Sequence, residues 1–245
     1  MVARAVDVVF PPRCAGCGDG RWPFCGRCLT ALEVLAPPWC ERCGRPPRAV
    51  ERCDDCPPLP VSVARAPFVY AGPARAAIHR LKFSGWRSIA AALADAMVAI
   101  DPPAADAVTW VPLARRRLAE RGYDQARALA GAVGSRLHLP VVRLTRRAVA
   151  TAPQARRPGD ERRVAMRGAF EPLRRSPPRI PRRVILVDDV LTTGSTAAAC
   201  AEALVRAGVR QVTLLTAARA FADRGRVYTR TGSQPGLWLP GDLPR

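Results

Sequence analysis

Two adjacent carboxylates stand directly before a cluster of hydroxyl side chains in VILVDDVLTTGST, residues 184–196. Amides of a loop that opens a helix form a cradle for a phosphate monoester. Two adjacent carboxylates repel a phosphate, but they accept hydrogen bonds from vicinal hydroxyls. The pattern therefore predicts a ligand that carries a phosphate and a diol close together, and ribose 5-phosphate has that layout.

Each side chain of this segment has an expected role. Asp188 and Asp189 are expected to hold the ribose hydroxyls. Gly194 lets the backbone approach the phosphate closely. The predicted phosphate-binding residues are Leu191, Thr192, Thr193, Gly194, Ser195 and Thr196. The alternative is an ordinary α/β loop with a fortuitous acidic pair, which the length of the pattern disfavours.

The elements around this loop predict a parallel sheet. The apolar run 184–187 is typical of a buried strand, a helix is expected over about 196–207, and Gly208 should end it. A short strand near 212–216 completes a βαβ unit, whose ligands bind at the carboxyl ends of strands. A further strand is expected over 108–113, followed by a helix from about 122 or 124 to 137.

Three consecutive arginines follow that further strand: Arg115, Arg116 and Arg117. Their guanidinium groups match phosphate oxygens bidentately, so they are candidates to bind a pyrophosphate. Arg121 is a second candidate. The alternative is a solvated helix start, because runs of charge usually face water.

Eight of the nine cysteines form four Cys-x-x-Cys pairs near the start of the chain, a spacing typical of zinc ligation. They are Cys14 and Cys17, Cys25 and Cys28, Cys40 and Cys43, Cys53 and Cys56. Eight thiolates predict two structural zinc ions, with sequential or interleaved pairing left open. The ninth, Cys200, lies among small apolar residues and is expected in the core.

The net charge of +19 is unevenly distributed. Of 39 basic residues only Lys82 is a lysine, and heavy arginine use is also what a biased genome composition would produce. Residues 143–183 hold 13 basic and 3 acidic side chains, a net charge of +10. Such a segment attracts polyanions, either pyrophosphate or nucleic acid.

Composition excludes several classes of protein. A hydrophobic content of 49% excludes a wholly disordered chain. No apolar run reaches the roughly 18 residues of a membrane span. The first residues lack the apolar stretch and cleavage site of a signal peptide. We therefore expect a cytoplasmic protein.

Four blocks, in order, resemble one family: AVDVVFPPRCAGCG at the start, HRLKFSG at 79–85, VPLARRRLAERGYDQA at 111–126, and the loop segment followed by LLTAAR at 214–219. VDDVLTTGST matches the phosphoribosyl diphosphate signature of type I phosphoribosyltransferases. The order of the blocks is similar to that of the ComF family, competence-associated phosphoribosyltransferase-like proteins with an N-terminal zinc finger.

The resemblance implies an α/β fold of the type I phosphoribosyltransferase class, with a Rossmann-like parallel sheet and a small N-terminal Cys-rich zinc module. The expected divisions are a zinc-binding module over 10–60, a phosphoribosyltransferase-like domain over 61–222 and a loose tail over 223–245. By position, residues 143–170 match the flexible loop that closes over the ligand. Its arginines Arg156, Arg157, Arg162 and Arg163 are expected to serve as a lid or a nucleic-acid contact.

The implied ligand is phosphoribosyl diphosphate with Mg²⁺, and the implied role is the uptake or processing of single-stranded DNA. A phosphoribosyltransferase is the first hypothesis. The second is a non-catalytic nucleic-acid-binding or adaptor protein that uses the sugar-phosphate site as a ligand sensor. A third role, with the zinc module docking a partner such as a competence helicase, rests on the resemblance alone. No acceptor base is specified by the residues.

Overall fold

The computed structural model describes residues 13–46, 53, 56–148, 168–174, 179–221 and 230–231. Its helices and strands follow the chain in this order: α2 (Gly26–Thr30), β1 (Glu33–Val34), β2 (Val61–Arg65), β3 (Phe68–Val69), α3 (Gly72–Phe83), α4 (Ile89–Ala99), β4 (Ala107–Trp110), α5 (Arg115–Arg121), α6 (Gln125–Leu137), β5 (Thr145–Arg147), β6 (Phe170–Pro172), β7 (Arg183–Leu191), α8 (Ser195–Arg206), β8 (Gln211–Arg219) and β9 (Arg230–Thr231).

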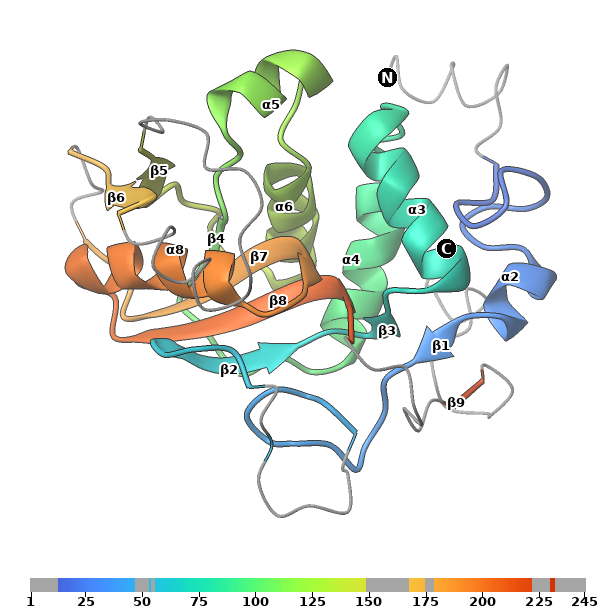
Figure 1. Ribbon diagram of the computed structural model, residues 1–245, viewed down its shortest axis with the longest axis horizontal. Coiled ribbons are helices and arrows are strands. Elements are labelled where there is room, and N and C mark those ends of the chain that lie inside the picture. Colours follow the sequence, from blue (N-terminus) through green and yellow to red (C-terminus); the bar gives the residue numbers. More distant parts are fainter. Residues whose placement is uncertain are drawn as a thin grey trace.

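A mostly parallel sheet forms the centre of the molecule (Figure 1). Within the described ranges it has seven strands in the order β4-β7-β8-β3-β1-β9, with β2 also paired to β8. The strands β4, β7, β8, β2 and β3 run parallel, whereas β1 and β9 add antiparallel pairs at one edge. A separate antiparallel pair, β5 and β6, lies beside α8. The predicted α/β fold with a mostly parallel sheet is confirmed.

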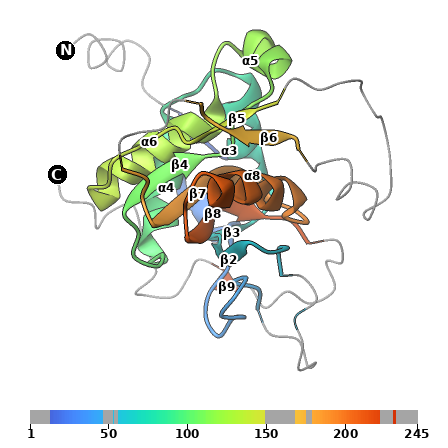
Figure 2. The same ribbon diagram turned by 90° about the vertical axis from the view of Figure 1, so that its left-hand side faces the viewer.

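Helices cover both faces of the sheet, α4 and α6 on one side and α8 on the other (Figure 2). Along β7, Ile185 and Val187 pack in the core under α3, α4 and α6, whereas Val184 and Leu186 pack under α8. Successive side chains of a strand point to opposite faces, so a strand buried on both faces must be continuously apolar. This explains the unbroken apolar run before Asp188.

The N-terminal cysteine segment packs into the same core as the sheet domain. Cys14, Phe24 and Leu32 belong to the buried cluster that contains Ile78 of α3. Farther along, β1 pairs with β3 and so joins the central sheet. The segment is therefore held by apolar packing and by strand pairing, in addition to its cysteines.

Two elements differ from their sequence-based expectations. The strand expected to end at the acidic pair continues to Leu191, because Asp188 and the residues that follow it still pair in register with β8. The strand expected over 108–113 ends at Trp110, since Pro112 lacks the amide that a ladder needs. The helices expected over 196–207 and 122–137 are confirmed as α8 and α6.

Candidate functional site

The predicted phosphate loop connects β7 to α8 at the carboxyl edge of the parallel strands. Gly194 stands at the start of α8 with φ of 76°, a left-handed conformation that favours glycine. Thr192 and Thr193 are exposed, and the Thr193 and Ser195 hydroxyl oxygens lie 2.9 Å apart. Amides in the first turn of a helix have no partner within the helix. The loop thus presents hydroxyls and helix-end amides in one place, an arrangement suited to an anion.

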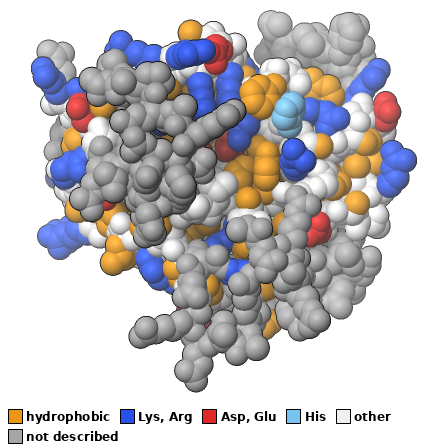
Figure 3. All heavy atoms as spheres, viewed as in Figure 1, with side chains coloured by type: hydrophobic (Ala, Val, Ile, Leu, Met, Phe, Trp, Pro, Cys, Tyr) orange, Lys and Arg blue, Asp and Glu red, His pale blue; other side chains and the backbone are white. Residues whose placement is uncertain are grey.

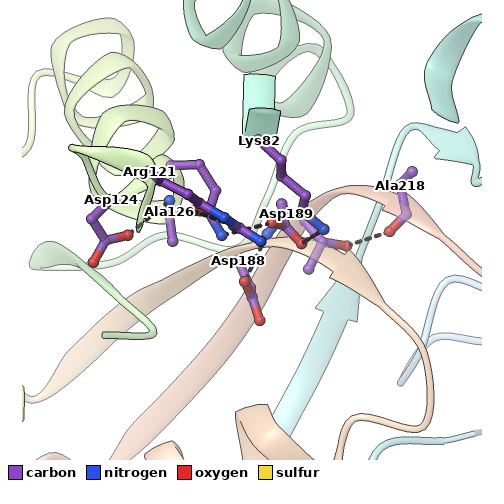
Figure 4. A network of polar contacts seen from close by, with 9 residues as sticks. Lys82, Arg121, Asp124, Ala126, Asp188, Asp189 and Ala218 are labelled. Atoms are coloured by element: carbon purple, nitrogen blue, oxygen red, sulfur yellow. Dashed lines mark hydrogen bonds and ion pairs between the residues drawn. The ribbon is translucent and has the colours of Figure 1, made fainter. Parts of the chain in front are cut away.

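The two aspartates of β7 point away from each other (Figure 4). They are consecutive residues of one strand, so their side chains leave opposite faces of the sheet. Asp189 is buried on the α3 and α6 side, whereas Asp188 is half-buried and accepts a hydrogen bond from the Asp189 amide at 2.9 Å. The two carboxyl groups therefore do not form one shared acceptor site for a pair of vicinal hydroxyls.

Both carboxylate oxygens of Asp189 have partners from other elements (Figure 4). The Lys82 Nζ at the end of α3 lies 3.0 Å from Oδ1. The Gln125 Nε2 at the start of α6 donates to Oδ2 at 3.0 Å. Arg121 of α5 continues this network, because it donates to the Gln125 Oε1 at 3.0 Å. Three helices are thus joined to β7 through one carboxylate.

Asp124 holds the start of α6, the helix that carries Gln125. Its Oδ1 accepts from the amides of Ala126 and Arg127 at 3.1 and 3.2 Å, which caps α6. Its Oδ2 accepts from the Leu113 amide at 3.2 Å. One side chain therefore ties the loop after β4 to the helix that positions Gln125.

Burial and the neighbouring Asp189 carboxylate raise the pKa of Asp188 to about 8. Near neutral pH Asp188 therefore holds its proton, and the charge of Asp189 is balanced by Lys82. A protonated carboxyl group both donates and accepts hydrogen bonds. Such a group suits a sugar hydroxyl, which also does both, and adds no charge to repel a nearby phosphate.

The arginine run predicted to bind pyrophosphate begins α5 and is exposed. Arg116 turns toward Glu120, with 2.8 Å between Nε and Oε1. Arg117 instead interacts electrostatically with Arg147 of β5. Burial and the charge of Arg117 lower the pKa of Arg147, while the charge of Asp188 opposes this effect. Arg147 thus interacts electrostatically with both Arg117 and Asp188, and a bound anion would relieve the repulsion between the two arginines. In the space-filling view, basic side chains gather in the upper middle of this face (Figure 3).

The four lid arginines Arg156, Arg157, Arg162 and Arg163 lie outside the described residues. Their role stays a prediction. At the described margins of this segment, Arg146 and Arg147 belong to β5, and Arg147 stacks over the Phe170 ring at 5.1 Å. The basic segment is therefore anchored beside α8 at both of its ends.

The eight cysteines form two quartets in sequential order: Cys14, Cys17, Cys25 and Cys28, then Cys40, Cys43, Cys53 and Cys56. The sulfur atoms of each quartet lie within 4.8 Å of one another. The Cys40 and Cys56 sulfurs, for example, are 3.8 Å apart. The pairing that the sequence left open is thus settled in favour of adjacent pairs, and each quartet has the four-thiolate set of a structural zinc site.

The surroundings of the thiols fit a metal. Burial opposes ionisation of Cys14, yet backbone hydrogen bonds from Cys25, Cys17 and Gly16 lower the pKa of its thiol to about 6. Backbone hydrogen bonds from Cys43 and Arg42 likewise lower the pKa of Cys40 to about 7, against burial. Thiolates are the metal-binding form of cysteine. Burial and neighbouring thiols instead raise the pKa values of Cys28, Cys43 and Cys56, an effect that a cation among the sulfurs would oppose. The four-thiolate sets fit two structural zinc ions.

Several residues of the site are not predicted by the sequence. Lys82 and Gln125 lie in blocks whose pattern indicates only the family. Arg147 belongs to the arginine-rich segment 143–170 expected to close over the ligand, and the structure places it in β5. One signal is present: Lys82 is the only lysine in a chain that otherwise uses arginine. Lysine is a compact point charge, whereas arginine is a planar fork, so the exception marks a position that requires the smaller cation. Cys200 is confirmed in the core.

Sequence comparisons agree with this combination of fold and site. The model of the double zinc ribbon domain matches residues 5–57. DNA utilization protein YhgH of Escherichia coli (strain K12) is 32% identical over 210 residues, 79% of this chain and 88% of its own. Competence protein F of Haemophilus influenzae is 29% identical, covering 84% and 90%. Competence protein ComFC of Bacillus subtilis (strain 168) is 26% identical, covering 75% and 78%.

One solved structure, that of TT1426 from Thermus thermophilus, is 18% identical with a TM-score of 0.32, over 58% of this chain and 86% of that one. That likeness is too low to bear on the fold.

The fold and the site define an α/β protein with a mostly parallel sheet, a strand-to-helix loop at its carboxyl edge and an N-terminal double zinc ribbon. The chain belongs to the ComF family of competence-related proteins. In the part of the chain that the structure describes, no helix has the length and apolar character to cross a membrane.

Proposed function

We propose that this protein binds phosphoribosyl diphosphate at the carboxyl edge of its sheet and acts in the handling of single-stranded DNA. The observation that carries the proposal is the combination of the phosphate loop at Gly194 with the Asp189 network of Lys82 and Gln125. The loop offers donors to the 5-phosphate, and Asp188 lies close to it on the same strand. The relatives named for competence and DNA utilization support the DNA role.

The pyrophosphate of this ligand is assigned to Arg117 and Arg147. Arg147 interacts electrostatically with Arg117 and with Asp188, and burial lowers the pKa of Arg147, so a bound anion stabilises its charged form. Arg116 contributes less to pyrophosphate binding, because its side chain is 90% exposed and pairs with Glu120. Bound Mg²⁺ would neutralise part of the pyrophosphate charge. The basic segment 143–183, of net charge +10, is assigned to the leaving group and to DNA phosphates.

The reaction class that this arrangement supports is pentosyl transfer. The bond between ribose C1 and a pyrophosphate oxygen breaks, and the oxygen keeps the electron pair. An acceptor atom then bonds to C1 and loses its proton to solvent. The described residues supply positioning and electrostatic stabilisation, with no covalent nucleophile. A turnover assay that follows pyrophosphate release across nucleobases and DNA tests this step directly.

A second candidate function is a non-catalytic DNA-binding protein that senses the sugar phosphate. The excess of 13 basic over 3 acidic side chains in residues 143–183 favours it, because one pyrophosphate does not require so much charge. Binding without pyrophosphate release in the turnover assay would support this candidate over the transferase.

Ligand-induced stabilisation tests the site. Phosphoribosyl diphosphate with Mg²⁺ should raise the melting temperature, since a ligand that binds only the native state stabilises it by mass action. Asp188→Asn with Asp189→Asn should abolish most of that rise. Asp106→Asn is the matched control, because Asp106 pairs with Arg183 at the other end of β7, 2.7 Å away. An equal rise in the double variant and the control would refute the assigned site.

A further inference from the structure

The second zinc quartet is directly joined to the phosphate loop by Pro57. This buried proline follows Cys56, one of the four ligands. A Cβ built at Gly194 would lie 2.6 Å from the Pro57 Cβ and 3.1 Å from its Cα. Non-bonded carbon atoms prefer separations of about 3.5–4.0 Å. The loop at Gly194 therefore rests on the proline ring with space only for a hydrogen atom.

The quartet also holds Pro57 from its other side. Arg42, between the ligands Cys40 and Cys43, donates to the Pro57 carbonyl at 2.7 Å. The Cys40 and Cys56 sulfurs are 3.8 Å apart, so one metal ion would fix both knuckles. Pro57 is thus held by its covalent neighbour and by a hydrogen bond from the opposite knuckle.

Gly194 is the residue at which this support matters most. It starts α8 and has a left-handed φ of 76°, so its path sets the direction of the neighbouring loop amides. We propose that Pro57 is a positioning residue, through which the zinc-loaded second quartet keeps the phosphate loop in its anion-binding conformation. The inference rests on the proposed function only for the identity of the anion. It makes sugar-phosphate affinity depend on the second zinc ion.

The first quartet has a different neighbour and provides a control. A Cβ at Gly16, between Cys14 and Cys17, would lie 2.9 Å from the Pro73 Cβ at the start of α3. Arg80 of α3 donates to the Ala15 and Gly16 carbonyls at 2.8 and 2.5 Å. The first quartet therefore braces α3, and the second braces the phosphate loop.

Hydrogen exchange in the zinc-loaded protein without ligand tests this positioning. Pro57→Gly should speed exchange of the amides of residues 191–196 by about tenfold, the effect of losing about 1.4 kcal/mol of support. Leu59→Ala is the matched control, since Leu59 lies in the same segment and is 72% exposed. Elemental analysis should find unchanged zinc in both variants. Equal exchange of the loop in the two variants would overturn the inference.

Two further comparisons isolate the metal and the contact. Cys53→Ser and Cys17→Ser should each lower the zinc content, but only Cys53→Ser should speed loop exchange.

Gly194→Ala should weaken ribose 5-phosphate binding less in the Pro57→Gly background than in wild type, because the backbone strain is the same in both and only the collision is relieved. Equal weakening in both backgrounds would contradict the contact.

The two proposals fail in different ways. Wild-type protein that binds neither ribose 5-phosphate nor phosphoribosyl diphosphate with Mg²⁺ would refute the proposed function. The exchange comparison between Pro57→Gly and Leu59→Ala would still decide whether Pro57 positions the loop.

Discussion

At the scale of single residues, Asp189 explains more of the site than its neighbour does. Its carboxylate forms an ion pair with Lys82 of α3 and accepts a hydrogen bond from Gln125 of α6. The Asp189 side chain is 8% exposed. A buried charge is tolerated when it is paired and hydrogen-bonded. Asp188 forms no ion pair within the described ranges, and burial and the Asp189 carboxylate raise its pKa to about 8 even though Lys82 and Arg147 interact with it electrostatically. Two identical residues thus have different surroundings because successive side chains of a strand point to opposite faces.

The Lys82–Asp189 pair gives a prediction about stability. Lys82→Met should destabilise the fold by roughly 3 kcal/mol, because it leaves a buried carboxylate without its cation. Combining it with Asp189→Asn should restore most of that loss, since the uncompensated charge is then gone as well. Urea unfolding of the two single variants and the double variant measures the free energies. Additive losses in the double variant would show that the pair does not interact.

The raised pKa of Asp188 gives a prediction about pH. Asp188 titrates near pH 3.8 when unfolded and near 8 when folded, so the folded state binds more protons between these values. The free energy of unfolding should therefore fall as pH rises through that window. Asp188→Asn removes this contribution, so the variant should gain stability relative to wild type between about pH 5 and 8, by on the order of 4 kcal/mol across that window at about 1.4 kcal/mol per pH unit. Parallel stability curves in urea would contradict the assigned proton.

At the scale of elements, the site is made where β7, α3, α6 and α8 meet. The strand, loop and helix of residues 184–206 were predictable, because the apolar run, the acidic pair and the helix start follow one another closely in the chain. The cysteine quartets were predictable for the same reason. Lys82 and Pro57 were not, since each comes from a distant segment and periodicity does not show which elements meet. The sequence around Gln125 is that of an ordinary amphipathic helix.

The two quartets give a prediction at this scale. Purified protein should contain about two zinc ions per chain, because each quartet provides a complete tetrahedral set. Elemental analysis measures the metal, and titration of thiols in the folded protein gives an independent count. Eight freely titratable thiols with no zinc would contradict both sites, whereas Cys200 should stay protected in either case because it is fully buried.

At the scale of the whole molecule, the excess of basic side chains is concentrated in one segment of the chain. Residues 1–60 hold 8 basic and 7 acidic side chains, whereas residues 143–183 hold 13 and 3. Eight thiolates with two zinc ions would add a charge of about −4, so the zinc-loaded ribbon is not basic. The arginine-rich segment is the part suited to a polyanion.

This charge separation predicts how DNA binding responds to salt. Replacing Arg156, Arg157, Arg162 and Arg163 with alanine should weaken single-stranded DNA binding for every sequence tested. The slope of log affinity against log salt should flatten by about 0.7 for each phosphate interaction that the substitutions remove. Fluorescence anisotropy across a salt series measures both. Unchanged affinity and slope would remove this segment from DNA binding and leave it the role of a lid.

The loop after β7 is central to the proposed function, because it is assigned the phosphate of a ribose phosphate. Backbone amide resonances followed by NMR during titration with phosphoribosyl diphosphate and Mg²⁺ test this assignment most directly. We expect the largest saturable shifts at residues 191–196, with smaller shifts at Asp188 and Lys82. Shifts confined to other parts of the chain, or none at saturating ligand, would contradict it.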